Sequence, residues 1–323
     1  MKRAQKVNYS PNKISTESPF AELDTVTVLM PLPFQGGQVN KKAHVKNLDY
    51  LLNNNFLDDG RQRVIGIGGT SLIHHLDWDS LFEVVKSTSQ IIGNQALLMA
   101  GVIPTPISQA KAFIEQCLQL KRCPDYFLLM PVPGLNNPDG IEIELRALTE
   151  GFGKKYGARF VLYLRNSYLK TAYTKLAQTC EYIAGIKVGT HPKDVKELFA
   201  NTPSSKRVLW GVGDRATNAA RQGALGHTSG LTLICPRLCD EINNAYRRQD
   251  MQASEQLEQQ LAALEEIRFM EDRIYNYSAI LTAAQLGGFQ DIDLGEGGPF
   301  NSPPPPKIVE QISACVETLK HYH

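Results

Sequence analysis

The residue in this sequence best suited to covalent chemistry is a lysine near the end of an apolar run. Residues 182–189 predict a buried strand, and Lys187 lies close to its carboxyl end. Burial disfavours the charged form of lysine, so it lowers the pKa and leaves a nucleophilic amine. Such an amine can form a Schiff base with a carbonyl substrate. The alternative is a lysine whose stem packs against the core while its ammonium reaches water.

A tyrosine and a glycine-rich segment could assist that amine. Tyr163 ends the apolar run 160–163, and a hydroxyl beside an amine can move the protons that imine formation requires. A tyrosine that only lines the core is the alternative. The Gly-Gly-Thr-Ser segment 68–71 offers backbone N–H groups and hydroxyls to a carboxylate next to the reacting carbonyl. Together these residues predict a 2-oxo acid site, in which the carboxylate is held by Gly69, Thr70 and Ser71.

Polar residues that follow other apolar runs are further candidates for substrate binding. Arg165 could hold a substrate carboxylate with its planar guanidinium, or it could pair with Asp214 as part of the structure. Thr228 and Ser229 could bind substrate or form an ordinary turn at the end of a strand. The residue types leave both alternatives open at each of these positions.

Eight apolar runs alternate with amphipathic helical patterns and would position these residues. Such alternation implies parallel strands joined by right-handed helical crossovers. The simplest fold that closes eight such units into one sheet is an α/β fold of the (β/α)8 TIM barrel type. In such barrels the active site lies at the carboxyl ends of the strands, where Lys187 and Tyr163 fall. An open doubly wound sheet is the alternative, but the glycines at 66–69 do not form its G-x-G-x-x-G turn. The apolar runs are 26–30, 64–67, 96–100, 126–130, 160–163, 182–189, 208–211 and 228–233.

The pattern divides the chain into three parts. Residues 1–23 carry little hydrophobic pattern and predict a loosely ordered N-terminal arm. Residues 24–250 hold the barrel, and residues 251–323 form a C-terminal helical region. That last region predicts helices at 254–266, 270–286 and 307–320, with an extended proline-rich loop at 294–306.

The composition narrows the class of protein. The 34 Lys and Arg residues balance 33 acidic residues, so we expect no nucleic-acid partner, which a basic excess would favour. No apolar run approaches the roughly 18 residues of a membrane span, so we expect no membrane partner. The six cysteines form no C-x-x-C pair, which favours reduced thiols and a cytoplasmic location. His, Cys, Asp and Glu show no metal-ligand spacing, so we expect no metal.

The ordered set of motifs resembles the Schiff-base lyases related to dihydrodipicolinate synthase and N-acetylneuraminate lyase. The resemblance covers residues 24–320. Gly-Ile-Lys at 185–187 is similar to the family's G-x-K at the imine lysine, and the strand ending at Tyr163 to the one ending in its catalytic tyrosine. Residues 68–71 occupy the place of the family's G-T-T-G carboxylate loop, and residues 31–34 resemble its T-P-F segment.

This resemblance implies a class I aldolase-like lyase acting on pyruvate or another 2-oxo acid. The imine would form on Lys187, Tyr163 would move protons, and no external cofactor would be needed. A homo-oligomer, a dimer or tetramer, is also implied. Residues 163–166 and 223–231 look more like the sugar-acid dehydratase branch, so dehydration of a sugar acid with the same lysine is an alternative.

Three departures from the family pattern bear on turnover. Gly69 stands where the first loop threonine relays protons, and Pro-Gly-Leu at 133–135 replaces the tyrosine pair that completes the relay from a neighbouring subunit. Tyr168 occupies the place of the arginine that binds a second carboxylate in the synthase. These changes argue against dihydrodipicolinate synthesis. They also leave open a catalytically impaired barrel that only binds a metabolite.

Overall fold

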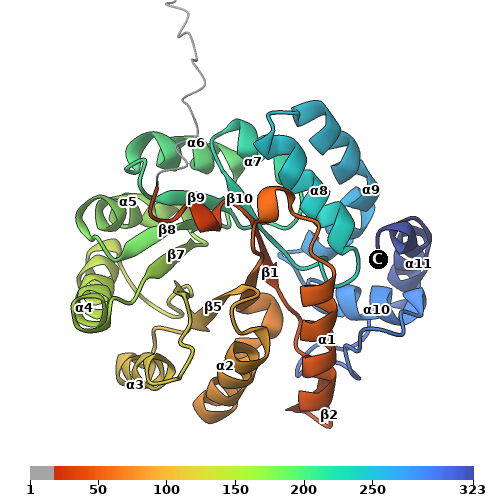
Figure 1. Cartoon of the computed structure of the whole chain (residues 1–323), viewed down its shortest axis with the longest axis horizontal. Helices are drawn as coiled ribbons and strands as arrows, with labels where there is room; N and C mark the ends of the chain where they lie inside the picture. The colour runs from red at the N-terminus through yellow and green to blue at the C-terminus, as the bar shows by residue number, and fades with distance from the viewer. Residues whose placement is uncertain (1–17) are drawn as a thin grey trace, which may run out of the picture.

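Eight parallel strands close into a barrel in the computed structural model, which describes residues 18–323 (Figure 1). Nearly every strand residue is buried, because the strands are covered by helices outside and by packed side chains inside. This confirms the predicted (β/α)8 barrel. The strands, each bonded to the next, are β1 (Val26–Leu29), β4 (Val64–Ile67), β5 (Leu97–Val102), β6 (Tyr126–Leu129), β7 (Phe160–Leu164), β8 (Ile183–Val188), β9 (Arg207–Trp210) and β10 (Gly226–Ser229), which pairs back to β1.

The helices that follow the strands form a ring outside the barrel (Figure 1). Their starts match the local sequence: Asn40, Asp77 and Asn137 accept hydrogen bonds from the first turns of α1, α2 and α4. A proline opens each of α4, α6 and α8, where a backbone N–H is not needed. The ring consists of α1 (Lys41–Asn53), α2 (Trp78–Ile92), α3 (Ile107–Leu118), α4 (Pro138–Tyr156), α5 (Lys170–Thr179), α6 (Pro192–Asn201), α7 (Thr217–Arg221) and α8 (Pro236–Arg247).

The eighth strand lies earlier in the chain than the predicted run 228–233. It ends at Ser229, whose hydroxyl accepts hydrogen bonds from the backbone N–H groups of Leu231 and Thr232, both at 3.1 Å. These bonds turn the chain immediately after the strand. The turn places Thr228 at the mouth of the barrel.

The C-terminal region contains α9 (Met251–Phe269), α10 (Ser278–Gly287) and α11 (Pro306–Leu319), and α11 packs on both α9 and α10. The predicted helix 270–286 is wrong in its first half. Three successive residues, Glu271, Asp272 and Arg273, have φ values of +44°, +57° and +78°, which no right-handed helix accommodates. Residues 270–277, which we name the bridging segment, instead cross toward the barrel mouth.

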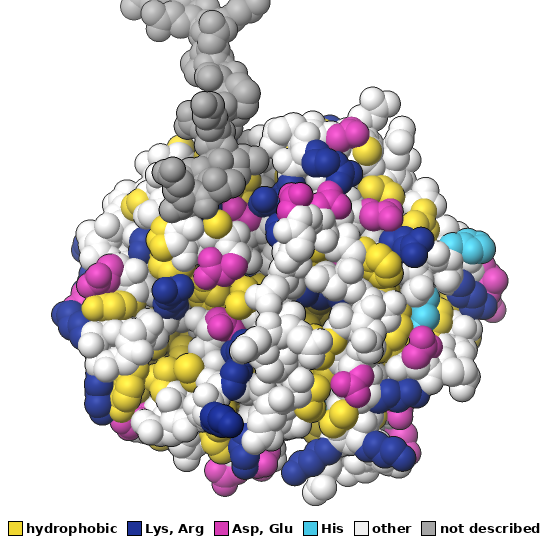
Figure 2. All heavy atoms as spheres, viewed as in Figure 1, with side chains coloured by type: hydrophobic (Ala, Val, Ile, Leu, Met, Phe, Trp, Pro, Cys, Tyr) yellow, Lys and Arg dark blue, Asp and Glu magenta, His cyan; other side chains and the backbone are white. Residues whose placement is uncertain are grey.

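The outer surface mixes both signs of charge. On the face seen in Figure 2, Lys and Arg side chains alternate with Asp and Glu side chains. Within residues 18–323 no helix is both long and apolar enough to cross a membrane. The three-part division of the chain remains a prediction, and residues 1–17 of the predicted arm lie outside the described residues.

Candidate active site

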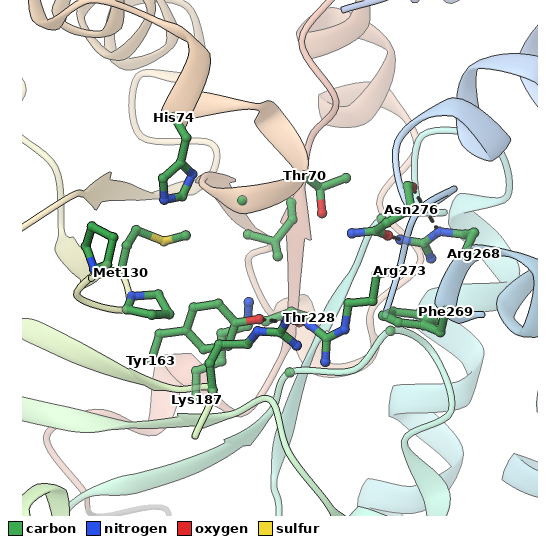
Figure 3. Close-up of a pocket in the computed structure, with 18 of the residues that line it drawn as sticks. Thr70, His74, Met130, Tyr163, Lys187, Thr228, Arg268, Phe269, Arg273 and Asn276 are labelled. Carbon is green, nitrogen blue, oxygen red and sulfur yellow. Dashed lines mark hydrogen bonds between the residues drawn. The ribbon is translucent and has the colours of Figure 1, made fainter. Parts of the chain in front are cut away.

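Lys187 and Tyr163 lie side by side at the mouth of the barrel (Figure 3). They are register partners on the neighbouring strands β8 and β7. The Nζ atom of Lys187 is 3.8 Å from the centroid of the Tyr163 ring. The two residues are only 2% and 7% exposed, and both line a cavity of about 400 Å³. A buried amine and a phenol therefore meet in one cavity.

The surroundings of Lys187 favour its neutral, nucleophilic form. Burial is the main cause that lowers the pKa of its ammonium, and the guanidinium groups of Arg273 and Arg165 lower that pKa further. Tyr163 raises the pKa of Lys187, but by less than burial and the two guanidinium groups lower it. Within residues 18–323, Lys187 is the only lysine that lines this cavity. The amine needed for Schiff-base chemistry is thus available at this position.

Two glycines leave room for the pair. A Cβ atom on Gly189 would lie 2.5 Å from the Tyr163 ring, and one on Gly211 would lie 2.9 Å from Cε of Lys187 and 2.8 Å from the carbonyl oxygen of Val188. Real Cβ atoms do not come so close, and the Val188 backbone cannot move away easily. These glycines set the space in which the two side chains lie.

We predict that Gly211→Ala slows reaction of the amine by about tenfold or more, since the added methyl group must displace Lys187. The measurement is the rate at which borohydride traps a pyruvate adduct. Gly151→Ala on α4 is the matched control, because a Cβ at Gly151 meets no atom within 4 Å. Equal trapping rates in the two variants would contradict the prediction.

The glycine-rich segment contributes two of its three predicted residues to the cavity. Gly69 and Thr70 line it, and Figure 3 shows the Thr70 hydroxyl turned toward it. Ser71 does not line it. Its hydroxyl donates to the carbonyl oxygen of Met30 at 2.6 Å and accepts from the N–H of Gly68 at 3.0 Å. Ser71 therefore ties the segment to the end of β1.

The last two residues of β10 also differ in whether they line the cavity. Thr228 lines the cavity, whereas the Ser229 hydroxyl points away from it and donates to Oδ2 of Asp214 at 2.8 Å. The other oxygen of Asp214 lies 3.2 Å from Nε2 of His227. Arg165 lines the cavity and pairs with Asp272 at 3.5 Å rather than with Asp214. The alternative that Arg165 pairs with Asp214 is therefore wrong.

The bridging segment brings in a residue that the sequence analysis missed. Nη1 of Arg273 donates to the Tyr163 hydroxyl at 3.2 Å (Figure 3). Nη2 donates to the carbonyl oxygen of Gly189 at 2.8 Å. The one available signal was the run of three charged residues at 271–273 inside an otherwise helical apolar pattern. That run alone does not predict which groups the Arg273 guanidinium contacts.

A buried ion pair supports the bridging segment from α9. Arg268 bonds to Glu265, and these side chains are 1% and 0% exposed. Nη2 of Arg268 also donates to Oδ1 of Asn276 at 2.7 Å. Burial raises the pKa of Glu265 to about 7, although Arg268 opposes the shift. Arg268 and Asn276 both line the cavity, so this pair forms part of its wall.

Comparisons with known proteins found matches in sequence. The sequence model of the Dihydrodipicolinate synthetase family matches residues 164–295. The 4-hydroxy-tetrahydrodipicolinate synthase of Thermodesulfovibrio yellowstonii is 25% identical over 255 residues, which cover 76% of this chain and 82% of that protein.

Solved structures share the fold. The dihydrodipicolinate synthase from Oceanobacillus iheyensis superposes with a TM-score of 0.81 at 17% identity, covering 93% of this chain and 97% of its own. The dihydrodipicolinate synthase from Bacillus clausii gives a TM-score of 0.82 at 17% identity, covering 93% and 99%. With the sequence matches, these findings confirm the resemblance of the chain to the dihydrodipicolinate synthetase family.

Proposed function

We propose that this lyase acts on pyruvate or another 2-oxo acid, by aldol cleavage or condensation, through an imine on Lys187. The observation that carries the proposal is the buried Lys187 amine packed against Tyr163 inside one cavity. Burial lowers the pKa of the Lys187 ammonium, and the neutral amine is the form that attacks a carbonyl carbon.

The proposed reaction begins when the Nζ lone pair attacks C2 of the 2-oxo acid. The C2=O π electrons move to oxygen, which takes a proton from the Tyr163 hydroxyl, and the nitrogen returns a proton to the phenolate so formed, which leaves a neutral carbinolamine. The carbinolamine hydroxyl then takes the Tyr163 proton and leaves as water while the nitrogen lone pair forms the C=N bond. The products are the protonated imine and the Tyr163 phenolate. Removal of a C3 proton turns the protonated imine into an enamine, whose C3 attacks an aldehyde carbon in condensation. Cleavage runs the same steps in reverse, and hydrolysis releases the lysine.

Substrate binding would use opposite walls of the cavity. Gly69 and Thr70 are proposed to hold the carboxylate of the 2-oxo acid, with Ser71 supporting them from behind. Arg165 and Thr228 are proposed to contact the rest of the substrate. This chemistry needs no external cofactor, because the imine itself accepts the electrons. We retain a cytoplasmic homo-oligomer, a dimer or tetramer, as part of the proposal.

Two other functions have specific observations in their favour. The dehydratase-like residues at 163–166 and 223–231 favour dehydration of a sugar acid through the same imine. The missing hydroxyls at Gly69 and Gly134 favour a catalytically impaired barrel that only binds its metabolite. Each aldol or dehydration product differs in mass from its substrate, so product analysis separates the three.

Borohydride trapping tests the proposal. With pyruvate, we expect the intact mass of the wild-type chain to increase by one reduced adduct, and peptide mapping to place that adduct on Lys187. Lys187→Ala should abolish it. Absence of an adduct on the wild type, or an undiminished adduct on Lys187→Ala, would contradict the imine assignment.

A further inference from the structure

Tyr163 has a charged partner that comes from outside the barrel strands. The Arg273 guanidinium donates to the Tyr163 hydroxyl at 3.2 Å and to the carbonyl oxygen of Gly189 at 2.8 Å. Gly189 directly follows β8, and Tyr163 lies on β7. A single planar group therefore connects the ends of the two strands that carry the candidate catalytic pair, which is a use suited to the fixed fork of arginine.

The backbone that delivers Arg273 is strained. Left-handed backbone is unfavourable for an ordinary residue, and Glu271, Asp272 and Arg273 adopt it in succession. The strain persists because both sides of the segment are held. On one side Arg268 bonds to Asn276, and on the other the Tyr277 hydroxyl donates to the carbonyl oxygen of Leu32 at 2.9 Å, near the end of β1. Backbone strain of this kind is most frequent at functional sites, where a side chain must be held in one position.

Basic groups surround Tyr163. Arg165 follows it on β7, and Arg273 reaches it from the bridging segment. Lys187 faces it from β8 and His74 lines the same cavity from the segment after β4, and burial lowers the pKa of both. In the part of the chain that the structure describes, no carboxylate lies within 4 Å of the Arg273 guanidinium. Burial raises the pKa of Tyr163, but a positive charge at Lys187 and the guanidinium groups of Arg273 and Arg165 together bring it below its ordinary value. When the C3 proton is removed, the positive charge at Lys187 is that of the protonated imine.

We propose that Arg273 is a positioning residue that holds Tyr163 and stabilises its phenolate, in place of the hydroxyl relay that Gly69 and Gly134 cannot supply. This inference rests on the proposed imine chemistry. A guanidinium has no proton to give at neutral pH, so Arg273 cannot relay protons as a hydroxyl does. It instead makes Tyr163 a base that needs no neighbouring hydroxyl.

The step affected is removal of the C3 proton from the protonated imine. The phenolate oxygen takes that proton, the C–H electron pair becomes the C2=C3 double bond, and the C=N π electrons return to nitrogen. The products are an enamine and a neutral phenol. In D2O the phenol exchanges its proton for deuterium, and the reverse step leaves deuterium on C3. No second substrate is required.

Exchange of the pyruvate methyl protons in D2O, followed by NMR, is therefore the experiment. We expect Arg273→Met to exchange at least about tenfold more slowly than the wild type at neutral pH, with the acidic limb of its rate profile displaced to higher pH. Arg273→Lys keeps the charge but not the two-pronged donation. We expect its rate to fall between the two, while the melting temperature stays close to wild type in both variants.

A second measurement follows Tyr163 directly. The ultraviolet titration of the wild type minus that of Tyr163→Phe isolates the ionisation of this tyrosine. The same difference taken in the Arg273→Met background should show ionisation at higher pH. Unchanged titration, or equal losses in Arg273→Met and Arg273→Lys with an unshifted profile, would overturn the inference.

The two measurements also separate this inference from the proposed function. If no imine is trapped on the wild type, the proposed function fails, and the Tyr163 titration still decides whether Arg273 stabilises the phenolate. If an adduct is trapped on the wild type but the Tyr163 titration and the exchange profile are the same in the Arg273 variants as in the wild type, only the present inference fails.

Discussion

Replacing Lys187 with arginine is expected to abolish both the trapped adduct and turnover. A guanidinium stays protonated at any pH the protein tolerates, so it offers no lone pair to a carbonyl. The substitution keeps a long basic side chain in the cavity, which separates the loss of imine chemistry from a loss of side-chain volume. The expected decrease in kcat is about 10⁴-fold or more, the scale seen when a covalent nucleophile is removed.

The measurements are intact mass after borohydride treatment and turnover of the substrate that product analysis identifies. Lys154→Arg on α4 is the matched control, because Lys154 is exposed and pairs with Glu150 on the same helix. It should match the wild type in both assays. An adduct that persists in Lys187→Arg would show that a different amine reacts.

Arg268→Met is expected to lower the free energy of unfolding by about 3–5 kcal/mol. The substitution leaves the Glu265 carboxylate buried without its cation. Burial already raises the pKa of Glu265 to about 7, above its ordinary 4.5, so the folded state binds a proton that the unfolded state releases between these values. Stability from this group therefore falls as the pH rises through that window. The cost of Arg268→Met should be larger at pH 8 than at pH 5.

Urea denaturation of the single and double variants measures this effect. Glu265→Gln in the Arg268→Met background removes the unpaired charge and should recover much of the loss at pH 8. A cost below about 1 kcal/mol that is equal at both pH values would contradict the role given to this pair.

The barrel and its central pair could be predicted from the sequence because both follow from repetition. Each strand is buried on both faces, so its sequence is a short apolar run. Eight such runs between helical patterns are compatible with few arrangements of the strands in a sheet. Once β7 and β8 are neighbours, Tyr163 and Lys187 at their ends must meet. The local sequence and the order of the strands lead to the same arrangement, so this part of the site could be predicted without knowing any contact between distant residues.

The remaining parts of the site depend on contacts between distant residues. Ser71 and Ser229 have suitable hydroxyls, but both hydroxyls satisfy nearby backbone or carboxylate groups instead of facing the cavity. The spacing of apolar residues over 270–286 fits one helix. The chain departs from it where Arg268 bonds to Asn276 and Tyr277 bonds to Leu32, and the second of these bonds joins residues that are far apart in sequence.

The position of Arg273 in the chain has a consequence for the order in which the site is assembled. A ribosome releases all eight strands, and with them the lysine–tyrosine pair, before it releases the bridging segment. The residues of the lysine–tyrosine pair therefore leave the ribosome before Arg273, the cation that bonds to the phenol. The contact between Arg273 and Tyr163 can form only after the bridging segment has been synthesised.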